Sequence, residues 1–273
     1  MMTNAPRPFP RFRAGFAIAS LSLLLMAATP ARAASTTLYS AASGLPSTQG
    51  WVTLGAGVPG SSGTQALAGG VLTQDSTPAG LATYGNFKTS PLTLDTATGF
   101  TLDFSLKVLS ESHHADGQRA GFSLLFIGND PKKSLELAFW TDKIWAYGLS
   151  GLSFTNSNQT AFDTQSTLTS YSLKVTNHQF SLFSGGSTLL SGALADYTPY
   201  AAVAPPATSV YAQSNLLFFG DDSTRAAAQV QIGQITLTPV PEPSSLMLMA
   251  CGGLAVLLGA LGQRRRQQVQ ALA

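Results

Sequence analysis

Glu136, Trp140, Trp145 and Tyr147 are the side chains of this sequence whose types and spacing best fit sugar recognition. Glu136 and Trp140 fall on one face of a strand-like segment, and Trp145 and Tyr147 share a face of the next, because successive strand side chains point to opposite sides. Aromatic rings can stack on the C–H faces of sugars, and a carboxylate accepts hydrogen bonds from their hydroxyl groups. The pattern predicts a glycan-binding site at these four residues. Plain packing of a partly covered sheet face around a hydrogen-bonded Glu136 is the competing interpretation.

The same segment argues against a glycoside hydrolase. A retaining enzyme of this kind needs two carboxyl groups about 5–5.5 Å apart, so a second acidic side chain should follow Glu136 on the same strand face. Positions 138 and 140 hold Ala and Trp instead. The sequence also contains no Gly-x-Ser-x-Gly nucleophile elbow and no glycine-rich phosphate loop after a strand. We therefore expect a protein that is not an enzyme, with a jelly-roll glycoside hydrolase as the alternative.

A second polar cluster, formed by Glu111, His113, His114 and Asp116, carries side chains that commonly bind metal ions. It follows a predicted strand and is expected in a loop, where binding sites often lie. Its spacing contains no His-x3-His motif and no Cys pair that would set a coordination geometry, so a polar turn is favoured over a metal site. Arg119, just beyond, is expected to form an ion pair with Asp116 or Glu111.

Asp221 and Asp222 form an acidic turn. Such a turn admits Ca²⁺ binding, because Ca²⁺ takes several oxygen ligands. The two adjacent residues lack the alternating Asp-x-Asp spacing of a calcium loop, so capping of the turn is the favoured role. No other cofactor is expected.

Alternating apolar and polar residues dominate the stretch from residue 34 to residue 239. Phe100–Val108 alternates without a break, as expected of a half-buried strand. Phe122–Ile127 is apolar almost throughout, which is typical of a strand buried on both faces. Hairpin patterns surround residues 141–143 and 177–178, and no 12-residue window shows a helical apolar period. The sequence therefore predicts an all-β fold, an antiparallel β-sandwich that forms one domain over residues 34–239.

The first 33 residues have the order of an export signal. Three arginines precede the uncharged, mostly apolar run Ala14–Ala28, and Ala31-Arg32-Ala33 fits the small-x-small pattern that signal peptidase cleaves. The apolar run is short for a membrane span, which needs about 20 residues. A signal peptide over residues 1–33 is predicted, with an uncleaved membrane anchor as the alternative.

The C-terminal segment consists of a Pro-Glu-Pro triplet, an apolar run and an arginine cluster. These parts are Pro241, Glu242 and Pro243; residues 246–262; and Arg264, Arg265 and Arg266. A helix over the apolar run would span about 26 Å, close to the thickness of a thin hydrocarbon core. The arginines would hold its end in the cytoplasm by the positive-inside rule. We expect a transmembrane sorting helix within residues 240–266, followed by a cytoplasmic tail over residues 267–273.

This segment resembles the PEP-CTERM sorting signal of Gram-negative bacteria, in which an exosortase recognises the Pro-Glu-Pro triplet and removes the helix. The resemblance implies signal peptidase and exosortase as processing partners. It also implies a transient inner-membrane intermediate and final delivery to the cell surface or the extracellular matrix, often in an exopolysaccharide-producing setting.

The body of the chain carries two further resemblances. Residues 171–192 are similar to the hairpin ladder of concanavalin A-like and laminin-G-like jelly rolls, in which the first and last strands pair. Residues 99–147 resemble choice-of-anchor domains, which are bacterial surface proteins with alternative C-terminal anchors. That family has no assigned function, so the resemblance implies a fold and transfers no catalytic residue.

The placement of charges excludes other classes of protein. The chain has a net charge of +2, yet residues 34–239 hold eight basic and twelve acidic residues, all scattered, so no nucleic-acid partner is expected. Cys251 is the only cysteine, which rules out an internal disulfide. Together the patterns predict a non-catalytic surface or matrix protein that binds exopolysaccharide, with a purely structural role in a biofilm as the alternative.

Overall fold

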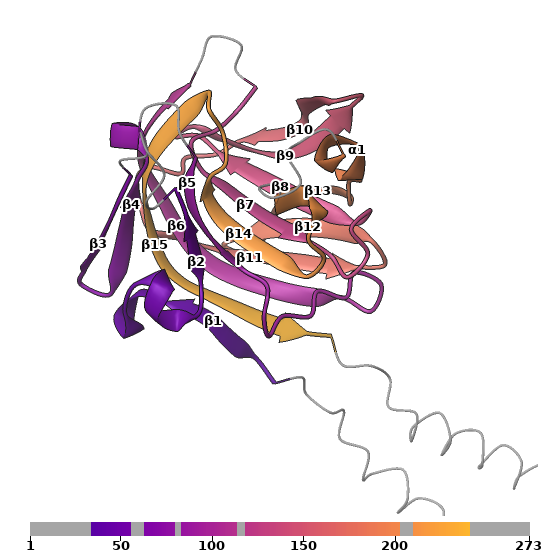
Figure 1. Cartoon of the computed structure of the whole chain (residues 1–273), viewed down its shortest axis with the longest axis horizontal. Coiled ribbons are helices and arrows are strands. Elements are labelled where there is room, and N and C mark those ends of the chain that lie inside the picture. Colours follow the sequence, from indigo (N-terminus) through magenta and orange to yellow (C-terminus); the bar gives the residue numbers. More distant parts are fainter. Residues whose placement is uncertain (1–33, 56–62, 80–82, 114–117, 203–209, 241–273) are drawn as a thin grey trace, which may run out of the picture. The chain divides into compact units, whose positions relative to one another are not determined.

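Two antiparallel sheets pack face to face in the computed structural model, which describes residues 34–55, 63–79, 83–113, 118–202 and 210–240 (Figure 1). The first strand starts at Thr36 and the last ends at Pro239. The predicted all-β antiparallel sandwich is thereby confirmed.

The eight-stranded sheet contains the first and the last strand. Its strands are β1 (Thr36–Ser40), β3 (Thr64–Ala68), β4 (Val71–Asp75), β6 (Phe100–His113), β11 (Thr169–Thr176), β12 (Gln179–Ser184), β13 (Ser187–Ala193) and β15 (Ala226–Pro239). Their order is β13-β12-β11-β6-β15-β4-β3, and β1 also pairs with β15. This pairing of first and last strands is the one that the jelly-roll resemblance predicts.

The seven-stranded sheet covers the other side of the core. Its strands are β2 (Val52–Leu54), β5 (Tyr84–Lys88), β7 (Ser123–Ile127), β8 (Ser134–Phe139), β9 (Lys143–Ser150), β10 (Ser153–Ala161) and β14 (Leu216–Asp221). Their order is β10-β9-β8-β7-β14-β5-β2. Strand β14, which comes late in the sequence, therefore lies beside β7, and only β7 separates it from β8.

The helices of the described residues are all short: α1 (Thr198–Ala201) and the 3-10 helices η1 (Ala41–Ser43), η2 (Pro46–Gln49), η3 (Thr77–Ala79) and η4 (Val210–Ala212). None of these helices has the length and apolar character needed to cross a membrane. The predicted signal peptide over residues 1–33 and the predicted sorting helix over residues 246–262 lie outside the described residues.

The core between the sheets is filled by the inward-facing residues of both. Along β6, alternate side chains from Phe100 to Val108 are buried, as the sequence pattern predicts. The rings of Phe100 and Phe126 meet edge to face with centroids 5.2 Å apart across the two sheets. Burying such a side chain stabilises the fold by roughly 1.5–3 kcal/mol relative to leaving it exposed, so these contacts hold the sheets together.

Two tight turns set the register of the β11-β12-β13 meander. Asn177 and His178 have φ values of 49° and 58°, which is the left-handed geometry of a two-residue type I′ turn. Gly185 and Gly186 form the corresponding turn between β12 and β13, with φ values of 56° and 81°. The predicted hairpin around residues 177–178 is confirmed.

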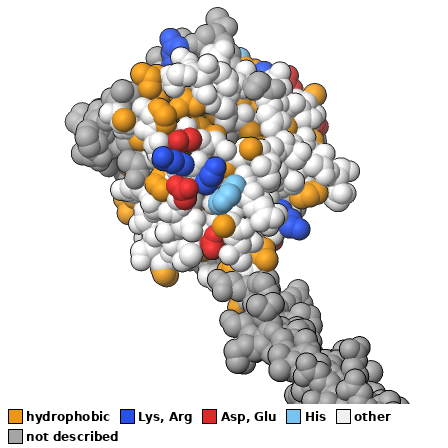
Figure 2. Space-filling view, turned by 90° about the vertical axis from the view of Figure 1, so that its right-hand side faces the viewer, with side chains coloured by type: hydrophobic (Ala, Val, Ile, Leu, Met, Phe, Trp, Pro, Cys, Tyr) orange, Lys and Arg blue, Asp and Glu red, His pale blue; other side chains and the backbone are white. Residues whose placement is uncertain are grey.

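Charged side chains are sparse on the surface. Figure 2 shows a face on which a few charges of both signs and a histidine lie together, beside hydrophobic side chains and large uncharged areas. Only 10% of all residues are charged. This mixture of signs differs from the basic stripe that nucleic-acid-binding proteins present.

Candidate functional site

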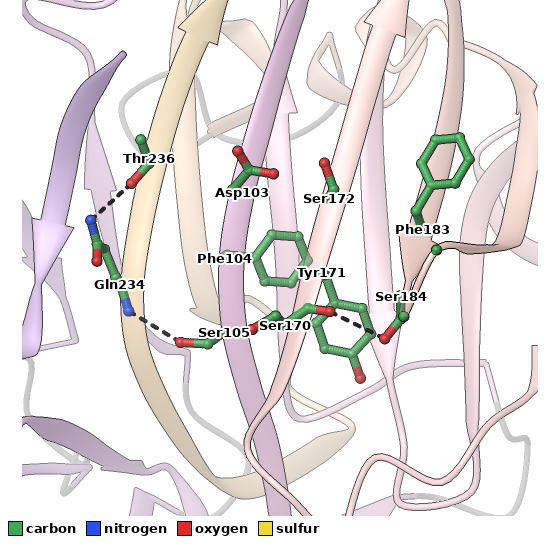
Figure 3. Close-up of a pocket in the computed structure, with 12 residues that line it drawn as sticks. Asp103, Phe104, Ser105, Ser170, Tyr171, Ser172, Phe183, Ser184, Gln234 and Thr236 are labelled. Carbon is green, nitrogen blue, oxygen red and sulfur yellow. Dashed lines mark hydrogen bonds between the residues drawn. The ribbon is translucent and has the colours of Figure 1, made fainter.

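A groove of about 600 Å³ crosses the outward face of the eight-stranded sheet, over β15, β6, β11 and β12 (Figure 3). Its floor consists of two rows of side chains that run across the strands. One row is Thr236, Asp103, Ser172 and Phe183; the other is Gln234, Ser105 and Ser170. Ser184, opposite Tyr171 in the ladder, also lines the groove, and its hydroxyl donates to the Ser170 backbone oxygen at 3.1 Å. The groove is thus rich in hydroxyl groups, with a carboxylate in the middle of one row and an aromatic ring at its end.

Strand periodicity and register create these rows. Along β6, Asp103 and Ser105 point outward because their neighbours Leu102, Phe104 and Leu106 point into the core. In the ladder, Asp103 lies opposite Thr236 on one side and Ser172 on the other. Ser172 in turn lies opposite Phe183, so consecutive members of the first row are one strand apart, about 4.8 Å.

A bulge in β15 shapes one edge of the groove. The β15–β6 register shifts between Ile232 and Ile235. A Cβ atom on Gly233 would lie 2.3 Å from Ser105 Oγ, so a larger residue at this position would displace the serine hydroxyl from Gln234. The backbone N–H of Gln234 donates to Ser105 Oγ at 3.3 Å, and its side-chain amide donates to Thr236 Oγ1 at 3.0 Å. These bonds hold Gln234 at the groove.

The central groove side chains are free to bind a ligand. In the parts of the chain that the structure describes, the Asp103 carboxylate and the Ser172 hydroxyl have no hydrogen-bond or ion-pair partner. Asp103 is exposed, and the ring of Phe183 is half-buried. The carboxylate can accept hydrogen bonds from hydroxyl or amino groups, and the ring offers an apolar surface for stacking.

The four residues predicted to bind a glycan lie together on the outward face of the other, seven-stranded sheet. They are buried, with exposed fractions of 0% for Glu136, 8% for Trp140, 0% for Trp145 and 2% for Tyr147. Residues of and beside α1 and η4, including Tyr197, Tyr200 and Tyr211, cover them. In this conformation a sugar has no access to the Glu136 carboxylate. The geometry fits the competing interpretation of a covered, packed face, and glycan binding at these four residues stays a prediction.

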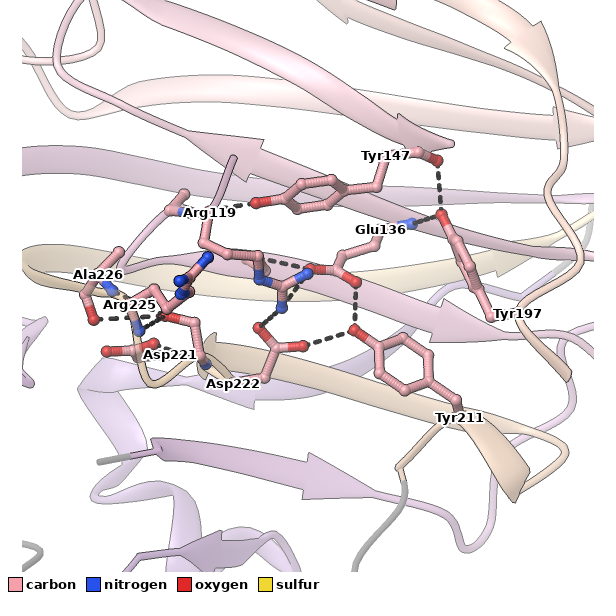
Figure 4. A network of polar contacts seen from close by, with 12 residues as sticks. Arg119, Glu136, Tyr147, Tyr197, Tyr211, Asp221, Asp222, Arg225 and Ala226 are labelled. Atoms are coloured by element: carbon pink, nitrogen blue, oxygen red, sulfur yellow. Dashed lines mark hydrogen bonds and ion pairs between the residues drawn. The ribbon is translucent and has the colours of Figure 1, made fainter. Parts of the chain in front are cut away.

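Beneath this cover lies a buried network of charges (Figure 4). Nη2 of Arg119 is 2.7 Å from Asp222 Oδ1 and 3.4 Å from Glu136 Oε1. The Tyr211 hydroxyl oxygen is 2.5 Å from Glu136 Oε2 and 2.8 Å from Asp222 Oδ2. Ser123 Oγ donates to Glu136 Oε1 at 3.1 Å. The network joins β7, β8, η4 and the end of β14.

One tyrosine hydroxyl bridges the two carboxyl groups of this network. Tyr211 has one hydroxyl hydrogen, yet its oxygen contacts a carboxyl group on each side. That hydrogen can be donated to Glu136 Oε2 or to Asp222 Oδ2, and Arg119 supplies the positive charge that both carboxyl groups face. Burial, followed by the nearby Asp222 charge, raises the pKa of Glu136 to about 7, against the opposing effects of Arg119 and of hydrogen bonds from Tyr211 and Ser123.

Glu136 and Arg119 have partners in the fold that the sequence analysis did not predict. No second carboxylate follows Glu136 along β8, as predicted. The second carboxylate of the network is Asp222, which directly follows β14. Arg119 pairs with Asp222 and Glu136 and not with Glu111, which pairs with His113. The other expected partner, Asp116, lies outside the described residues. Close packing of the segment before β7 positions the arginine, since a Cβ atom on Gly121 would lie 2.0 Å from the backbone of β15.

The predicted metal cluster is only partly described. His114 and Asp116 lie outside the described residues, whereas Glu111 and His113 lie in β6 itself, not in a loop as expected. His113 Nδ1 is 2.7 Å from Glu111 Oε2, and its ring stacks on Trp140 with centroids 3.8 Å apart. Within the described ranges, no group of three or more His, Cys, Asp or Glu side chains could hold a metal ion.

The two carboxylates of the acidic turn at the end of β14 have different partners. Asp221 Oδ1 accepts a hydrogen bond from the backbone N–H of Ser223 at 2.9 Å, so the predicted turn capping is confirmed for Asp221. Burial raises the pKa of Asp221 to about 8. Asp222 instead belongs to the Arg119 network. Calcium binding at this turn stays a prediction.

The predicted sorting residues lie outside the described residues: Pro241, Glu242, Pro243, Arg264, Arg265 and Arg266.

Comparison with solved structures shows the fold. A carbohydrate esterase from the Shiga toxin-encoding bacteriophage phi24B is similar at 14% identity and a TM-score of 0.52, covering 76% of this chain and 100% of that chain. A galectin-like protein of unknown function from Bacillus subtilis has 10% identity and a TM-score of 0.44, covering 75% of this chain and 96% of its own. The carbohydrate-binding module CBM66 from Bacillus subtilis has 11% identity and a TM-score of 0.41, with coverage of 69% and 95%. The first of these agrees with the predicted concanavalin A-like jelly roll.

Sequence comparison identifies the C-terminal segment. A search of the curated proteins finds no match to this chain. Residues 239–266 match the PEP-CTERM protein-sorting motif, which confirms the resemblance drawn from the Pro-Glu-Pro triplet, the apolar run and the arginine cluster. The chain therefore carries a PEP-CTERM sorting signal, which implies exosortase-dependent export.

Proposed function

We propose that the protein is a non-catalytic surface or extracellular-matrix protein of a Gram-negative bacterium that binds exopolysaccharide along the outward groove of its eight-stranded sheet. The observation that carries this proposal is the cross-strand row of Asp103, Ser172 and Phe183. It combines an unpaired carboxylate, a free hydroxyl and an accessible aromatic ring on one face. These are the chemical groups by which proteins hold sugars.

The dimensions of the row suit a chain of sugars. Asp103 and Phe183 are two strands apart, which places them about 10 Å from one another. The groove extends over four strands, so neighbouring sugars of one polysaccharide can contact the carboxylate and the ring together. Because the sheet holds these side chains in register, they need little reordering when a ligand binds.

The charge distribution favours binding without hydrolysis. Glycoside hydrolysis uses a pair of carboxyl groups on either side of the scissile bond. Among the described residues that line the groove, Asp103 is the only acidic one. The Glu136–Asp222 pair is a carboxyl pair with a raised pKa, yet Glu136 is wholly buried on the other sheet.

Replacing Phe183 by Ala should weaken polysaccharide binding about tenfold, because loss of an aromatic stacking surface costs roughly 1–1.5 kcal/mol. The measurement is retention of the full chain on immobilised polysaccharides isolated from the producing bacterium. Leu152→Ala is the matched control. Leu152 is 52% exposed in the turn between β9 and β10 of the seven-stranded sheet, whereas the groove lies on the eight-stranded sheet. Equal binding by the wild type, Phe183→Ala and Leu152→Ala would contradict the assignment of binding to the groove. Absence of binding by the wild type would favour the purely structural role.

Substituting Pro241 and Glu242 together by Ala should block removal of the sorting segment and leave a larger product in the inner membrane. The reason is that exosortase recognition is proposed to depend on the Pro-Glu-Pro triplet within the matched motif. Membrane fractionation and immunoblotting compare this variant with Gln267→Ala, which alters the predicted cytoplasmic tail instead. Release of a normally sized product from the Pro241 and Glu242 variant would refute the processing proposal.

A further inference from the structure

Asp103 is the one charged side chain among the described residues that line the groove. No ion pair between described residues includes Asp103. Its cross-strand neighbours, Thr236 and Ser172, are uncharged. The middle of the groove therefore presents an uncompensated negative charge to a ligand.

The lysines on the same sheet lie outside the groove. Lys174 is opposite Thr101, in the next row along the strands. Lys107 lies four residues along β6 from Asp103, and its Nζ is 3.4 Å from the backbone oxygen of Ser166. Neither lysine lines the groove, and neither forms an ion pair with Asp103.

We infer that Asp103 determines the charge class of the bound glycan, so that the groove prefers a polysaccharide with free amino groups over a neutral one and rejects a uronate polymer. This inference rests on the proposed glycan binding and deepens it. An ammonium group on a sugar ring can donate a charge-assisted hydrogen bond to Asp103, whereas a neutral sugar donates only through hydroxyl groups. A uronate carboxylate at the same place has no proton to donate and is repelled.

The expected selectivity is moderate and depends on salt. One charge–charge contact near 4 Å at a protein surface changes affinity by about fivefold to tenfold at low ionic strength. The effect shrinks as salt increases, because the Debye length falls from about 30 Å at 0.01 M to about 8 Å at 0.15 M. Stacking on Phe183 is apolar and should not depend on salt in this way.

The test compares three polymers of different charge with one set of proteins. The full chain, purified in a neutral detergent, is passed over immobilised chitosan, dextran and alginate at 0.01 M and 0.15 M salt. Wild type should bind in the order chitosan, dextran, alginate, with about fivefold to tenfold steps that narrow at high salt. Asp103→Asn, which keeps the size of the side chain, should bind all three polymers within about twofold of one another.

Two control variants separate the effect of the Asp103 charge from the effect of stacking on Phe183 and from the effect of the protein's net charge. Asp142→Asn removes one negative charge from an exposed turn of the other sheet and should leave the ranking unchanged. Phe183→Ala should lower binding to all three polymers by a similar factor and preserve the ranking. If wild type binds the polymers without a charge ranking, or if Asp103→Asn behaves like Asp142→Asn, the inference fails while glycan binding stands. If wild type binds no polymer, the proposed function itself fails.

Discussion

Replacing Arg119 by Met is expected to lower the free energy of unfolding by about 3–5 kcal/mol at pH 7, because it leaves the buried Asp222 and Glu136 without a cation. The side chains are 12%, 6% and 0% exposed for Arg119, Asp222 and Glu136, so solvent cannot take over the role of the guanidinium. The variant also loses the stacking of the guanidinium over Tyr147 and Phe154, whose ring centroids lie 4.8 Å and 4.5 Å away. Denaturant unfolding measures the loss.

Two comparisons test the cause of this destabilisation. Lys132→Met removes a positive charge from an exposed turn and should change the free energy of unfolding by less than about 0.5 kcal/mol. Adding Glu136→Gln and Asp222→Asn to Arg119→Met removes the uncompensated charges and should recover a large part of the loss. An Arg119→Met protein as stable as Lys132→Met would mean that the network contributes nothing to the fold.

The second large effect is a loss of stability as the pH rises. The folded state holds the pKa of Glu136 at about 7, above its ordinary value of 4.5, chiefly through burial. Between these values the folded protein keeps a proton that the unfolded chain has released. The resulting stabilisation is fully present below about pH 4.5 and is lost as the pH rises through about 7. The shift corresponds to a decline on the order of 3 kcal/mol.

Glu136→Gln should remove this part of the pH dependence, because an amide keeps the shape of a protonated carboxyl group and cannot ionise. Denaturant unfolding between pH 4.5 and pH 8 should give the variant a flatter profile than the wild type. Asp221, with a pKa raised to about 8 by burial, contributes a second decline of the same sign, so a residual slope should remain in the variant. Asp142→Asn is the control and should keep the wild-type slope. A wild-type profile that is flat over this range would contradict the raised pKa of Glu136 in the folded protein.

Local sequence patterns were sufficient to predict some of the strands, among them β6 and β7. Side-chain direction alternates along any strand, so the unbroken alternation of Phe100–Val108 already separated core from outward positions. The hairpin at Asn177-His178 was also predictable from the sequence, because a two-residue hairpin turn needs residues that accept a positive φ. The sorting motif is also local, since it is defined by the order of a triplet, an apolar run and an arginine cluster.

The same local patterns could not decide between an accessible and a covered aromatic face on the seven-stranded sheet. Glu136, Trp145 and Tyr147 do share one face, as alternation predicts, but alternation says nothing about what lies on top of that face. Tyr197 and Tyr211, which cover it, come from a stretch without any periodic signal. The groove residues were missed for a related reason, since Asp103, Ser172 and Phe183 look like ordinary outward positions of three separate strands.

The sequence by itself therefore determined the all-β class, the two predicted hairpins and the outward or inward direction of side chains in the alternating segments, because these depend on neighbours along the chain. Only the tertiary structure decided which outward face stays open, which acidic residue joins Glu136, and which side chains line up across β6, β11 and β12. Those outcomes depend on strand order and register between distant segments. Asp222 reaches Glu136 because β14 lies one strand from β8, and Asp103 meets Ser172 and Phe183 because the ladder pairs them.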